Sequence, residues 1–548
     1  MLYGNITGLK SSQVNYLERL YRRKVSSEII THELARTLTE ISFQINRQVG
    51  ILINRAGIIT HVIIGDAKGI FIPSLENYPL GKKALRGLRL IHTHLKQENL
   101  TQDDLTDLAL LRLDMIAAIG VKDGLPGNLF IAHLLPGTEK TMDITSYKDF
   151  YMLDLNFNEF ISSLEEEMER SRGFSHDEKR ERAILVSVST KSKYEHEDSV
   201  EELKELAESS DILVLDTILQ KPKNINPKFL MGEGKLKELI INALNKGATL
   251  LVFDQELSPS QIKAISDLTE IKVIDRSQLI LDIFARRAHS RDGKVQVELA
   301  QLKYRLPRLT GKGTAMSRLM GGIGGRGPGE MKLEVDRRRV RDRIALLEKK
   351  LKELAEARKQ RKHRRIETGI PIVSIIGYTN AGKSTLLNSL TRSYVFTENK
   401  LFATLDTSSR RLRFPKDRDI IITDTVGFIR DLPEDLMAAF KSTLEELEDA
   451  DMLLHIVDIS NPRFEQHIES VENILRQLGL IEKPRLLVFN KIDKVSQEEV
   501  SNLKMRYNAI AISALNPSTF MELLDAIEIN IWGLKQQNYQ DVLKSIKV

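Results

Sequence analysis

Short apolar runs alternate with amphipathic stretches over much of the chain. Runs typical of buried strands lie at 183–188, 212–215, 249–253 and 272–274, and helical patterns separate them at 200–208, 234–243 and 260–268. This β-α-β alternation predicts a small parallel sheet with helices on its faces. Residues 1–165 predict another α/β domain, in which Gly50–Asn54 and Ile58–Ile64 form a hairpin around Arg55-Ala56-Gly57.

Two later segments carry apolar residues at alternating spacings of four and three. The first arm has Val295, Leu299, Leu302, Leu306 and Leu309, and the second has Val340, Ile344, Leu347, Leu351 and Leu354. A seven-residue apolar repeat in both arms predicts paired helices. The glycine-rich segment Thr310–Glu330 joins them, so we expect an antiparallel coiled hairpin with a mobile tip. Pro307 is expected to kink or end the first arm.

Charge is concentrated in the second arm. Residues 331–365 hold 15 Lys or Arg and 6 Asp or Glu, a balance of +9 that exceeds the +5 of the whole chain. Lys312, Arg318 and Arg326 add to it in the tip. Charge runs also occur on solvated helical faces, but this density favours contact with nucleic-acid phosphates. Because no aromatic residues are interleaved, we expect recognition of RNA shape and backbone, without DNA specificity.

The amino-acid composition excludes several classes of site and of protein. The chain has 548 residues and no cysteine, so disulfides, thiolate zinc sites and cysteine nucleophiles are excluded. The first residues do not read as a signal peptide, and no apolar run reaches the roughly 18 residues of a membrane helix. These features are compatible with a reducing cytosol.

A phosphate-binding motif follows the apolar run 371–376. It has the form G-x-x-x-x-G-K-S and precedes a helical pattern: Gly377, Tyr378, Thr379, Asn380, Ala381, Gly382, Lys383, Ser384, Thr385. In this strand–loop–helix context, backbone N–H groups surround the phosphates and the helix N-terminus favours their charge. Lys383 is expected to reach the β- and γ-phosphates, and the Ser384 hydroxyl to ligate Mg²⁺.

Three further motifs follow in the order expected of a guanine-nucleotide site. They are Asp424-Thr425-Val426-Gly427, Asn490-Lys491-Ile492-Asp493 and Ser513-Ala514. Asp424 can hold Mg²⁺ through water, and the Gly427 N–H can contact the γ-phosphate. Asp493 can accept hydrogen bonds from the N1–H and amine of guanine, a donor pair that adenine lacks, so the site favours GTP over ATP. Backbone N–H groups at 513–514 can contact the guanine O6.

Few residues are candidates for catalysing GTP hydrolysis. We assign catalysis to Lys383, Thr404 and Gly427, with Ser384 and Thr404 as the Mg²⁺ ligands. Thr404 lies between the phosphate loop and Asp424, although Thr397, Thr407 and Thr423 compete for this role. Phe428 occupies the position where many small GTPases place a water-orienting glutamine. Since a phenyl ring cannot bind water in this way, we expect slow intrinsic hydrolysis that a partner accelerates.

Two histidines form a candidate metal site near the N-terminus. His92 and His94 follow the run 88–91, with Thr101 and Asp104 downstream. Two histidines on one strand face and an aspartate can bind zinc. The spacing resembles the zinc motif of JAB/JAMM-type metalloproteases, whose upstream glutamate would be Glu40. The alternative is a pair of structural histidines, and we expect a JAB-like fold without assigning activity.

The chain resembles the HflX family of translational GTPases over residues 180–530. The resemblance lies in residues 231–235, 275–280, 282–285, 296–300, 321–330 (GGIGGRGPGE), 377–385, 402–406 and 424–428. It implies an α/β subdomain with a helical hairpin, a Ras-like GTPase domain, binding to the large ribosomal subunit and, in several members, ribosome splitting. It also implies a hydrophobic residue at Phe428, and in some members ATP binding, here near Gly232–Lys235.

Two departures limit this resemblance. The first 165 residues precede the usual family start, and only 34 residues follow Ala514, so we expect the additional C-terminal domain of many members to be absent. We therefore predict an α/β protein with an N-terminal α/β domain (1–165), an α/β subdomain (180–275), a basic helical hairpin (276–366, tip 310–330), a Ras-like P-loop GTPase domain (367–535) and a tail (536–548).

The predicted function is a Mg²⁺-dependent GTPase that binds the large ribosomal subunit and its rRNA and splits or rescues ribosomes. We expect a cytoplasmic monomer without a membrane span, with a peripheral membrane-associated fraction. Two alternatives remain open: a nucleotide-gated scaffold whose hairpin binds RNA, a protein or a membrane surface, and a JAB-like metallopeptidase domain regulated by a GTPase. Ribosome-stimulated GTP turnover separates the three.

Overall fold

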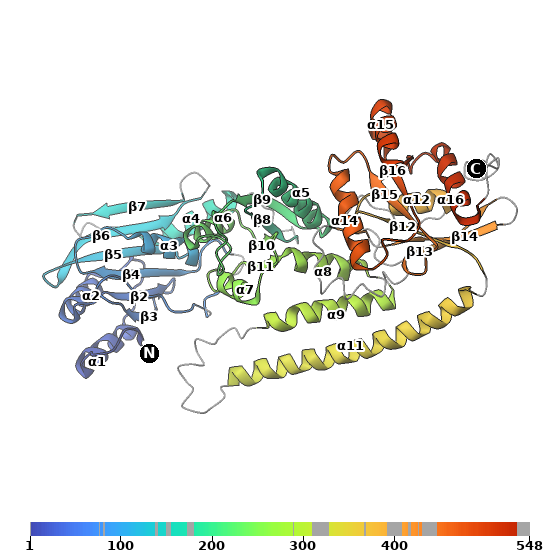
Figure 1. Cartoon of the computed structure of the whole chain (residues 1–548). Helices are drawn as coiled ribbons and strands as arrows, with labels where there is room; N and C mark the ends of the chain where they lie inside the picture. The colour runs from blue at the N-terminus through green and yellow to red at the C-terminus, as the bar shows by residue number, and fades with distance from the viewer. Residues whose placement is uncertain are drawn as a thin grey trace. The chain divides into compact units, whose positions relative to one another are not determined.

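The computed structural model describes residues 2–75, 77–80, 83–136, 141–148, 155–171, 180–288, 290–309, 328–366, 369–391, 408–414, 418–425, 427–429 and 447–533. Its elements group into two compact units. One comprises residues 1–184, 220–251 and 264–273, and the other comprises residues 185–219, 252–263 and 274–548. Figure 1 shows the helices and strands with their labels.

A seven-stranded sheet forms the core of the N-terminal part, in the order β1-β3-β2-β4-β5-β6-β7. The strands are β1 (Leu2–Gly4), β2 (Val49–Asn54), β3 (Ile59–Ile64), β4 (Leu88–His94), β5 (Met115–Lys122), β6 (Leu125–Leu134) and β7 (Met142–Tyr147). The pairs β1–β3 and β4–β5 are parallel, and the other neighbours are antiparallel. The β2–β3 pair confirms the predicted hairpin. Strand β4 is buried along its whole length, which fits its central position.

Helices cover this sheet because their apolar residues recur on one side. They are α1 (Ser11–Arg19), the 3-10 turn η1 (Leu20–Arg22), α2 (His32–Ile45), α3 (Gln102–Leu111) and α4 (Phe157–Ser171). Helix α2 buries Leu34, Leu38 and Ile41, spaced three or four apart, in the same core as β4. Helix α3 begins with a capping box in which Thr101 and Asp104 bond to each other.

All strands and helices predicted between residues 183 and 275 are present. The four-stranded sheet has the order β11-β10-β8-β9. Its strands are β8 (Arg182–Val188), β9 (Leu213–Gln220), β10 (Leu250–Phe253) and β11 (Lys272–Asp275). The helices are α5 (Lys193–Ser209), α6 (Glu233–Asn245), α7 (Pro259–Ser266) and α8 (Arg276–Arg287). Helix α6 begins at Glu233 with Gly232 as its N-cap, so residues 232–235 form a helix start.

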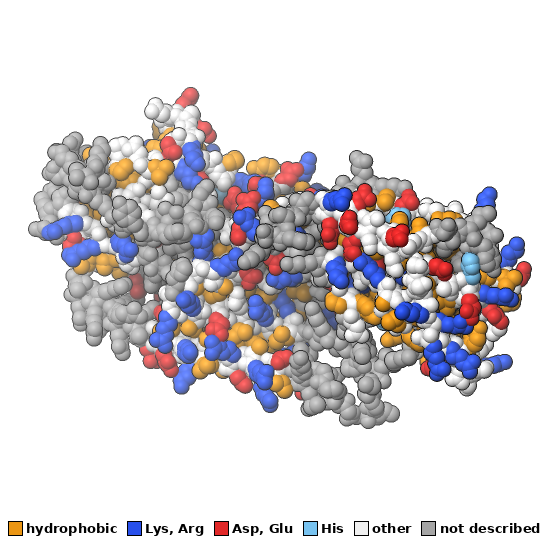
Figure 2. Space-filling view, turned by 180° about the vertical axis from the view of Figure 1, so that it is seen from behind, with side chains coloured by type: hydrophobic (Ala, Val, Ile, Leu, Met, Phe, Trp, Pro, Cys, Tyr) orange, Lys and Arg blue, Asp and Glu red, His pale blue; other side chains and the backbone are white. Residues whose placement is uncertain are grey.

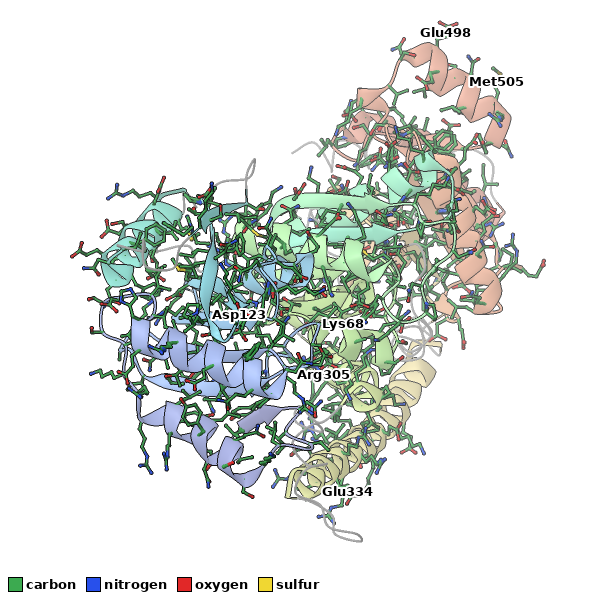
Figure 3. The ribbon with its side chains drawn as sticks, turned by 90° about the vertical axis from the view of Figure 1, so that its left-hand side faces the viewer. Lys68, Asp123, Arg305, Glu334, Glu498 and Met505 are labelled. Atoms are coloured by element: carbon green, nitrogen blue, oxygen red, sulfur yellow. The ribbon has the colours of Figure 1, made fainter. Side chains whose placement is uncertain are left out.

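Helices α9 (Arg291–Arg308) and α11 (Pro328–Ile366) form the predicted hairpin and lie side by side (Figure 1). Arg343 of α11 donates to both carboxylate oxygens of Glu298 at 2.7 and 3.0 Å, and Lys303 pairs with Glu348 at 2.8 Å. Helix α9 ends one residue after Pro307, as expected of a proline that prevents continuation. Figure 3 labels Arg305 on α9 and Glu334 on α11.

A six-stranded sheet forms the C-terminal domain (residues 369–533), in the order β13-β14-β12-β15-β16-β17. Its strands are β12 (Ile372–Gly377), β13 (Ser408–Phe414), β14 (Arg418–Asp424), β15 (Met452–Asp458), β16 (Arg485–Asn490) and β17 (Ile510–Ala511). All neighbours are parallel except β13–β14. The helical elements are α12 (Lys383–Thr391), α14 (Phe464–Gln477), η4 (Ile492–Lys494), α15 (Gln497–Tyr507), η5 (Pro517–Thr519) and α16 (Met521–Trp532).

Parallel strands bring their carboxyl ends to one edge of a sheet, where ligands bind in such folds. The phosphate loop follows β12, the Asp424 motif ends β14, and the Asn490 motif ends β16. The three predicted motifs therefore meet at this edge. Figure 3 labels Glu498 and Met505 on α15, in the same domain.

Several predicted features lie outside the described residues: Thr404, its competitors Thr397 and Thr407, Val426, residues 402–406, and most of the glycine-rich tip. No helix among the described residues is long and apolar enough to cross a membrane. Basic and acidic side chains are interspersed on the face shown in Figure 2, in keeping with totals of 81 and 76 in the sequence.

Candidate functional site

The phosphate loop is shaped by glycines that no other residue could replace without movement. Gly377 ends β12 and Lys383 begins α12, which confirms the predicted strand–loop–helix context. Gly382 has a φ of +92°, and a Cβ there would lie 2.3 Å from Nδ2 of Asn490. The loop therefore requires glycine both for its conformation and for its close approach to the neighbouring motif.

Lys383 is held inside the loop. Its ammonium donates to the backbone carbonyl of Tyr378 at 2.8 Å, and the residue is 6% exposed. Burial lowers the pKa of Lys383 to about 8, and attraction to Asp424 opposes this shift. A Cβ on Gly427 would lie 2.9 Å from the same ammonium nitrogen. The structure thus brings together Lys383 and Gly427, two of the three residues predicted to be catalytic.

Ser384 and Asp424 form an oxygen pair at the sheet edge. The Ser384 hydroxyl donates to Oδ2 of Asp424 at 2.5 Å. Asp424 is fully buried at the end of β14, and the neighbouring Thr425 hydroxyl donates to the carbonyl of Ile375 at 2.7 Å. Hydroxyl and carboxylate oxygens are hard ligands of the kind Mg²⁺ prefers. The donor set therefore fits the predicted Mg²⁺, which these two residues would hold with the nucleotide phosphates.

The guanine-side motifs are joined by hydrogen bonds. Asn490 donates from Nδ2 to the carbonyl of Ala381 at 2.8 Å and accepts at Oδ1 from the backbone N–H of Ala514 at 2.8 Å. The Ser513 hydroxyl donates to Asp493 at 2.5 Å, and Asp493 itself is exposed. Asp493 is thus accessible from outside the protein. Asn490 is 1% exposed and holds three loops together.

Phe428 is attached to the phosphate loop by its backbone. Its N–H donates to the carbonyl of Gly377 at 3.1 Å, and its carbonyl accepts from the N–H of Thr379 at 2.8 Å. The residue is 4% exposed, so its ring is packed inside the protein. The position after Gly427 thus presents no polar side chain to a water molecule.

Two aspartates without a predicted role take part in side-chain networks. Asp254 accepts from Ser187, Ser199 and Arg276 at 3.0, 2.6 and 2.9 Å. Asp275 accepts from the Tyr304 hydroxyl at 2.5 Å and caps the N-terminus of α8. The partners lie far away in sequence, so no local spacing could have revealed them.

A second candidate site lies on β4 of the N-terminal sheet. Nε2 of His92 lies 3.0 Å from Nε2 of His94, and Asp104 approaches the two rings at 3.3 and 3.5 Å. Both histidines are buried, and the three ligand atoms lie within 4.8 Å of one another. Thr101 donates twice to Asp104 at 2.7 Å, which orients the carboxylate. These groups are the metal-ligand set found among the described residues.

The residues around the two histidines are small. In the strand register, Gly50 of β2 and Ala118 of β5 flank His92, and Gly120 flanks His94. The proposed glutamate, Glu40, is exposed on α2 and accepts from Gln44. The structure does not bring Glu40 into this group.

Three family models match the chain. Residues 197–285 match a model described as GTP-binding GTPase N-terminal, and residues 287–365 match the GTP-binding GTPase middle region. Residues 372–491 match the model of a 50S ribosome-binding GTPase. These three stretches cover the α5–α8 region, the hairpin and most of the C-terminal domain.

Curated relatives match a large part of the chain. GTPase HflX of Caldanaerobacter subterraneus subsp. tengcongensis is 52% identical over 64% of this chain and 80% of its own length, and GTPase HflX of Escherichia coli K12 is 43% identical over 64% and 83%. A GTP-binding protein from Sulfolobus solfataricus, solved with GDP, is 27% identical over 67% of this chain and 99% of that chain, with a TM-score of 0.36. On the identity and coverage of the two curated relatives, the chain belongs to the HflX family of GTPases and is a GTP hydrolase.

Proposed function

We propose that this GTPase binds the large ribosomal subunit, that the subunit stimulates its GTP hydrolysis, and that the cycle drives splitting or rescue of ribosomes. The observation that carries the proposal is the match of residues 372–491 to the 50S ribosome-binding GTPase model. In this proposal the protein acts as a monomer in the cytoplasm, where ribosomes are found, with a fraction at the membrane surface. The domain boundaries remain those predicted from the sequence.

Site residues take the following parts in the proposed reaction. Lys383 would neutralise charge on the β- and γ-phosphates, while Gly427 would donate its N–H to the γ-phosphate. Ser384 and Thr404 would complete the coordination of Mg²⁺, which bridges the phosphates and offsets their charge. Asp493 would select guanine. The described geometry of Lys383, Gly427 and Ser384 supports these assignments, and Thr404 lies outside the described residues.

Phe428 supports dependence on a partner. Because its ring is buried beside the phosphate loop, it cannot orient the attacking water. A group from the ribosome, or a rearrangement that the ribosome induces, would then supply this orientation. The turnover of the isolated protein is expected to stay well below ~1 s⁻¹, and the large subunit should raise it.

The hairpin supports contact with rRNA, and its contacts show which arginines are available. Arg338, Arg339 and Arg341 of α11 are exposed. Arg337 instead donates to the carbonyl of Leu309 at 2.7 Å and thereby ties α11 to the end of α9. Neutralising Arg337 would disturb the hairpin itself, so the exposed three are the better probes of phosphate contact.

The first experiment measures GTP turnover with and without purified large and small subunits. We expect stimulation by the large subunit only. Lys383→Ala should abolish nucleotide binding and the stimulated activity. Turnover that is equal with and without large subunits, in a protein that binds GTP, would refute the proposed control by the ribosome.

The second experiment replaces Arg338, Arg339 and Arg341 by Gln and measures cosedimentation with large subunits at several salt concentrations. Fewer phosphate contacts should weaken binding and flatten its salt dependence. The matched control replaces Arg19, Arg22 and Lys24, which are equally exposed but lie in the N-terminal part. Equal binding by both triple variants would exclude the hairpin as the docking element.

A second candidate function is supported by the histidine pair on β4. We propose that the N-terminal domain is JAB-like and binds a divalent metal such as Zn²⁺ through His92, His94 and Asp104. Its support is the convergence of three ligand atoms within 4.8 Å in a setting of small neighbours. Glu40, the glutamate that the metalloprotease resemblance would require, is exposed on α2 and does not join these three ligands. We therefore propose metal binding in preference to peptide hydrolysis.

Metal content of the purified protein tests this proposal. The wild type, dialysed after exposure to Zn²⁺, should retain about one equivalent, whereas His94→Ala should retain none. His61→Ala is the matched control, because His61 is also buried in the same sheet but bonds to Thr60 outside the cluster. Equal zinc retention by the two variants would contradict the proposed ligands.

A further inference from the structure

The phosphate loop is bonded to a helix outside the C-terminal domain. The hydroxyl of Tyr378, the residue after Gly377, donates to Oε1 of Glu202 on α5. The Tyr378 ring stacks on His467 of α14, with centroids 3.9 Å apart and planes 3° from parallel. Tyr378 is 7% exposed, so this bond is shielded from water. Shielding makes a hydrogen bond to a charged carboxylate strong and its loss costly.

Tyr378 also forms a hydrogen bond through its backbone. Its backbone carbonyl accepts the bond from the Lys383 ammonium at 2.8 Å. Lys383 is the group expected to respond to the presence of the γ-phosphate. Tyr378 thus connects Lys383, through its backbone carbonyl, to Glu202, through its ring hydroxyl.

Glu202 belongs to a buried ion-pair network. Its second oxygen accepts from Arg276 at the start of α8, and Arg276 donates to Asp254 at 2.9 Å. Arg276 is 6% exposed and Glu202 is 9% exposed. Because buried charges are stable only when paired, neither group can move without the other.

The network continues to the hairpin through the residue next to Arg276. Asp275 accepts from the hydroxyl of Tyr304 on α9 at 2.5 Å and from the N–H of Leu257 at 3.0 Å. The guanidinium of Arg308 lies 3.6 Å from the centre of the Tyr304 ring. Side-chain contacts, joined by the peptide bond between Asp275 and Arg276, therefore run from the phosphate loop to the first arm of the hairpin.

We propose that Glu202 is a positioning residue for the phosphate loop, supplied by α5, and that it couples the bound nucleotide to helix α9 through Arg276 and Asp275. Coupling of this kind requires that GDP and GTP favour different arrangements of the same contacts. This coupling depends on the proposed ribosomal function only in one respect, that rRNA is the ligand of the hairpin. The coupling itself is a property of the isolated protein.

Tyr378→Phe removes the hydroxyl and keeps the ring stacked on His467. We expect the ratio of affinities for a non-hydrolysable GTP analogue and GDP, measured with fluorescent nucleotides, to change about fivefold or more, within the usual range of coupling between sites. Glu202→Gln replaces the charged acceptor of this bond by a weaker, neutral one and should change the ratio in the same direction. Because it also weakens the bond to Arg276, the effect of the double variant should be smaller than the sum of the two single effects. Additive effects would refute the coupling through this bond.

Two control variants test whether Glu202 positions the phosphate loop or only holds α5 against the C-terminal domain. Arg463→Met breaks the 2.7 Å ion pair between Arg463, at the start of α14, and Asp198 of α5, without touching the phosphate loop. Tyr507→Phe removes a hydroxyl that bonds to an exposed glutamate, Glu465. Neither variant should change the ratio. An effect of Arg463→Met equal to that of Tyr378→Phe would show that Glu202 only holds the helix in place and would overturn the proposal.

Hydrogen exchange of the α9 amides measures whether the bound nucleotide affects the hairpin. In the wild type without ribosomes, amides of α9 should exchange at different rates with GDP and with the GTP analogue, and Tyr378→Phe should remove this difference. Tyr304→Phe, which cuts the path at Asp275, should do the same while leaving the affinity ratio unchanged. A difference that persists in Tyr378→Phe, or is missing in the wild type, would refute the coupling. Loss of ribosome stimulation alone would refute the proposed function and leave this result standing.

Discussion

The side-chain amide of Asn490 donates to the backbone carbonyl of Ala381 over 2.8 Å, which links the guanine motif to the phosphate loop. Its other amide atom accepts from Ala514, so one buried side chain fixes the loops after β12, β16 and β17. The parts of the site proposed to bind the base and the phosphates are therefore positioned by the protein itself. Preorganisation of this kind reduces the entropic cost of binding.

Asn490→Ala should weaken the binding of both GDP and GTP by at least ~10-fold, because it removes two hydrogen bonds worth about 1 kcal/mol each. Titration with a fluorescent nucleotide measures the change. The control is Asn530→Ala, since Asn530 also donates to a backbone carbonyl, that of Ala526 at 2.8 Å, but on the exposed face of α16. Similar losses in both variants would mean that the effect is not local to the site.

Asp493→Asn should lower GTP affinity and raise affinity for xanthosine triphosphate. Xanthine carries a carbonyl in place of the guanine amine, and an asparagine amide can donate to that carbonyl. The guanine amine would lose its acceptor, at a cost of about 1–3 kcal/mol. Competition between the two nucleotides measures the exchange of preference. If guanine remained preferred by the same factor, Asp493 would not be the base-selecting residue.

Gly427→Ala should reduce kcat by ~10-fold or more, corresponding to about 1.4 kcal/mol in the barrier. The added Cβ would lie 2.8 Å from Cγ2 of Thr379 and 2.9 Å from the Lys383 nitrogen, so the loop or the lysine must shift. Gly69→Ala is a suitable control, because a Cβ at Gly69 meets no atom within 4 Å. Single-turnover hydrolysis on large subunits is the measurement, and unchanged rates for Gly427→Ala would contradict the proposed role.

His455 should make the C-terminal domain less stable in acid. Burial, followed by repulsion from Arg485 and Lys383, lowers the pKa of His455 to about 3. Between the ordinary pKa of about 6.5 and this value, the unfolded chain binds a proton that the folded chain does not. The free energy of unfolding therefore falls as pH decreases through this window, by at most about 1.4 kcal/mol per pH unit, and is unaffected above it.

His455→Gln should reduce this pH dependence. Urea unfolding at pH 7 and pH 5 measures it, with fluorescence of Trp532 as the probe, because the sequence has one tryptophan and its ring packs against Phe414 in this domain. His32→Gln, at an exposed histidine, is the control. An equal dependence on pH in wild type and His455→Gln would show that His455 does not control the response.

Features that depend on neighbouring residues could be predicted from the sequence. The phosphate loop, the hairpin arms and the β-α-β alternation are all encoded in local spacing, and the structure confirms each of them. The capping box of Thr101 and Asp104 is also local, and it brings Asp104 to the two histidines of β4.

Contacts between distant segments could not be predicted in this way. Tyr378 and Glu202 are 176 residues apart, and no periodicity connects a tyrosine in a loop to a glutamate on a helix. Gly50 lies across from His92 only because of the strand register. Arg337 lies beside Arg338, Arg339 and Arg341, and nothing in the sequence distinguishes it from them. In the structure, Arg337 donates to the carbonyl of Leu309.

The start of α8 places an unusual restriction on the chain. Asp275 contacts Tyr304 and its neighbour Arg276 contacts Glu202, so two consecutive residues serve partners on different helices. Inserting one residue between them would rotate the rest of α8 by about 100°, given 3.6 residues per turn. Replacing either side chain breaks one contact, but an insertion or deletion at this point breaks the register of both. Changes in length at residues 275–276 should therefore be far less tolerated than changes in identity.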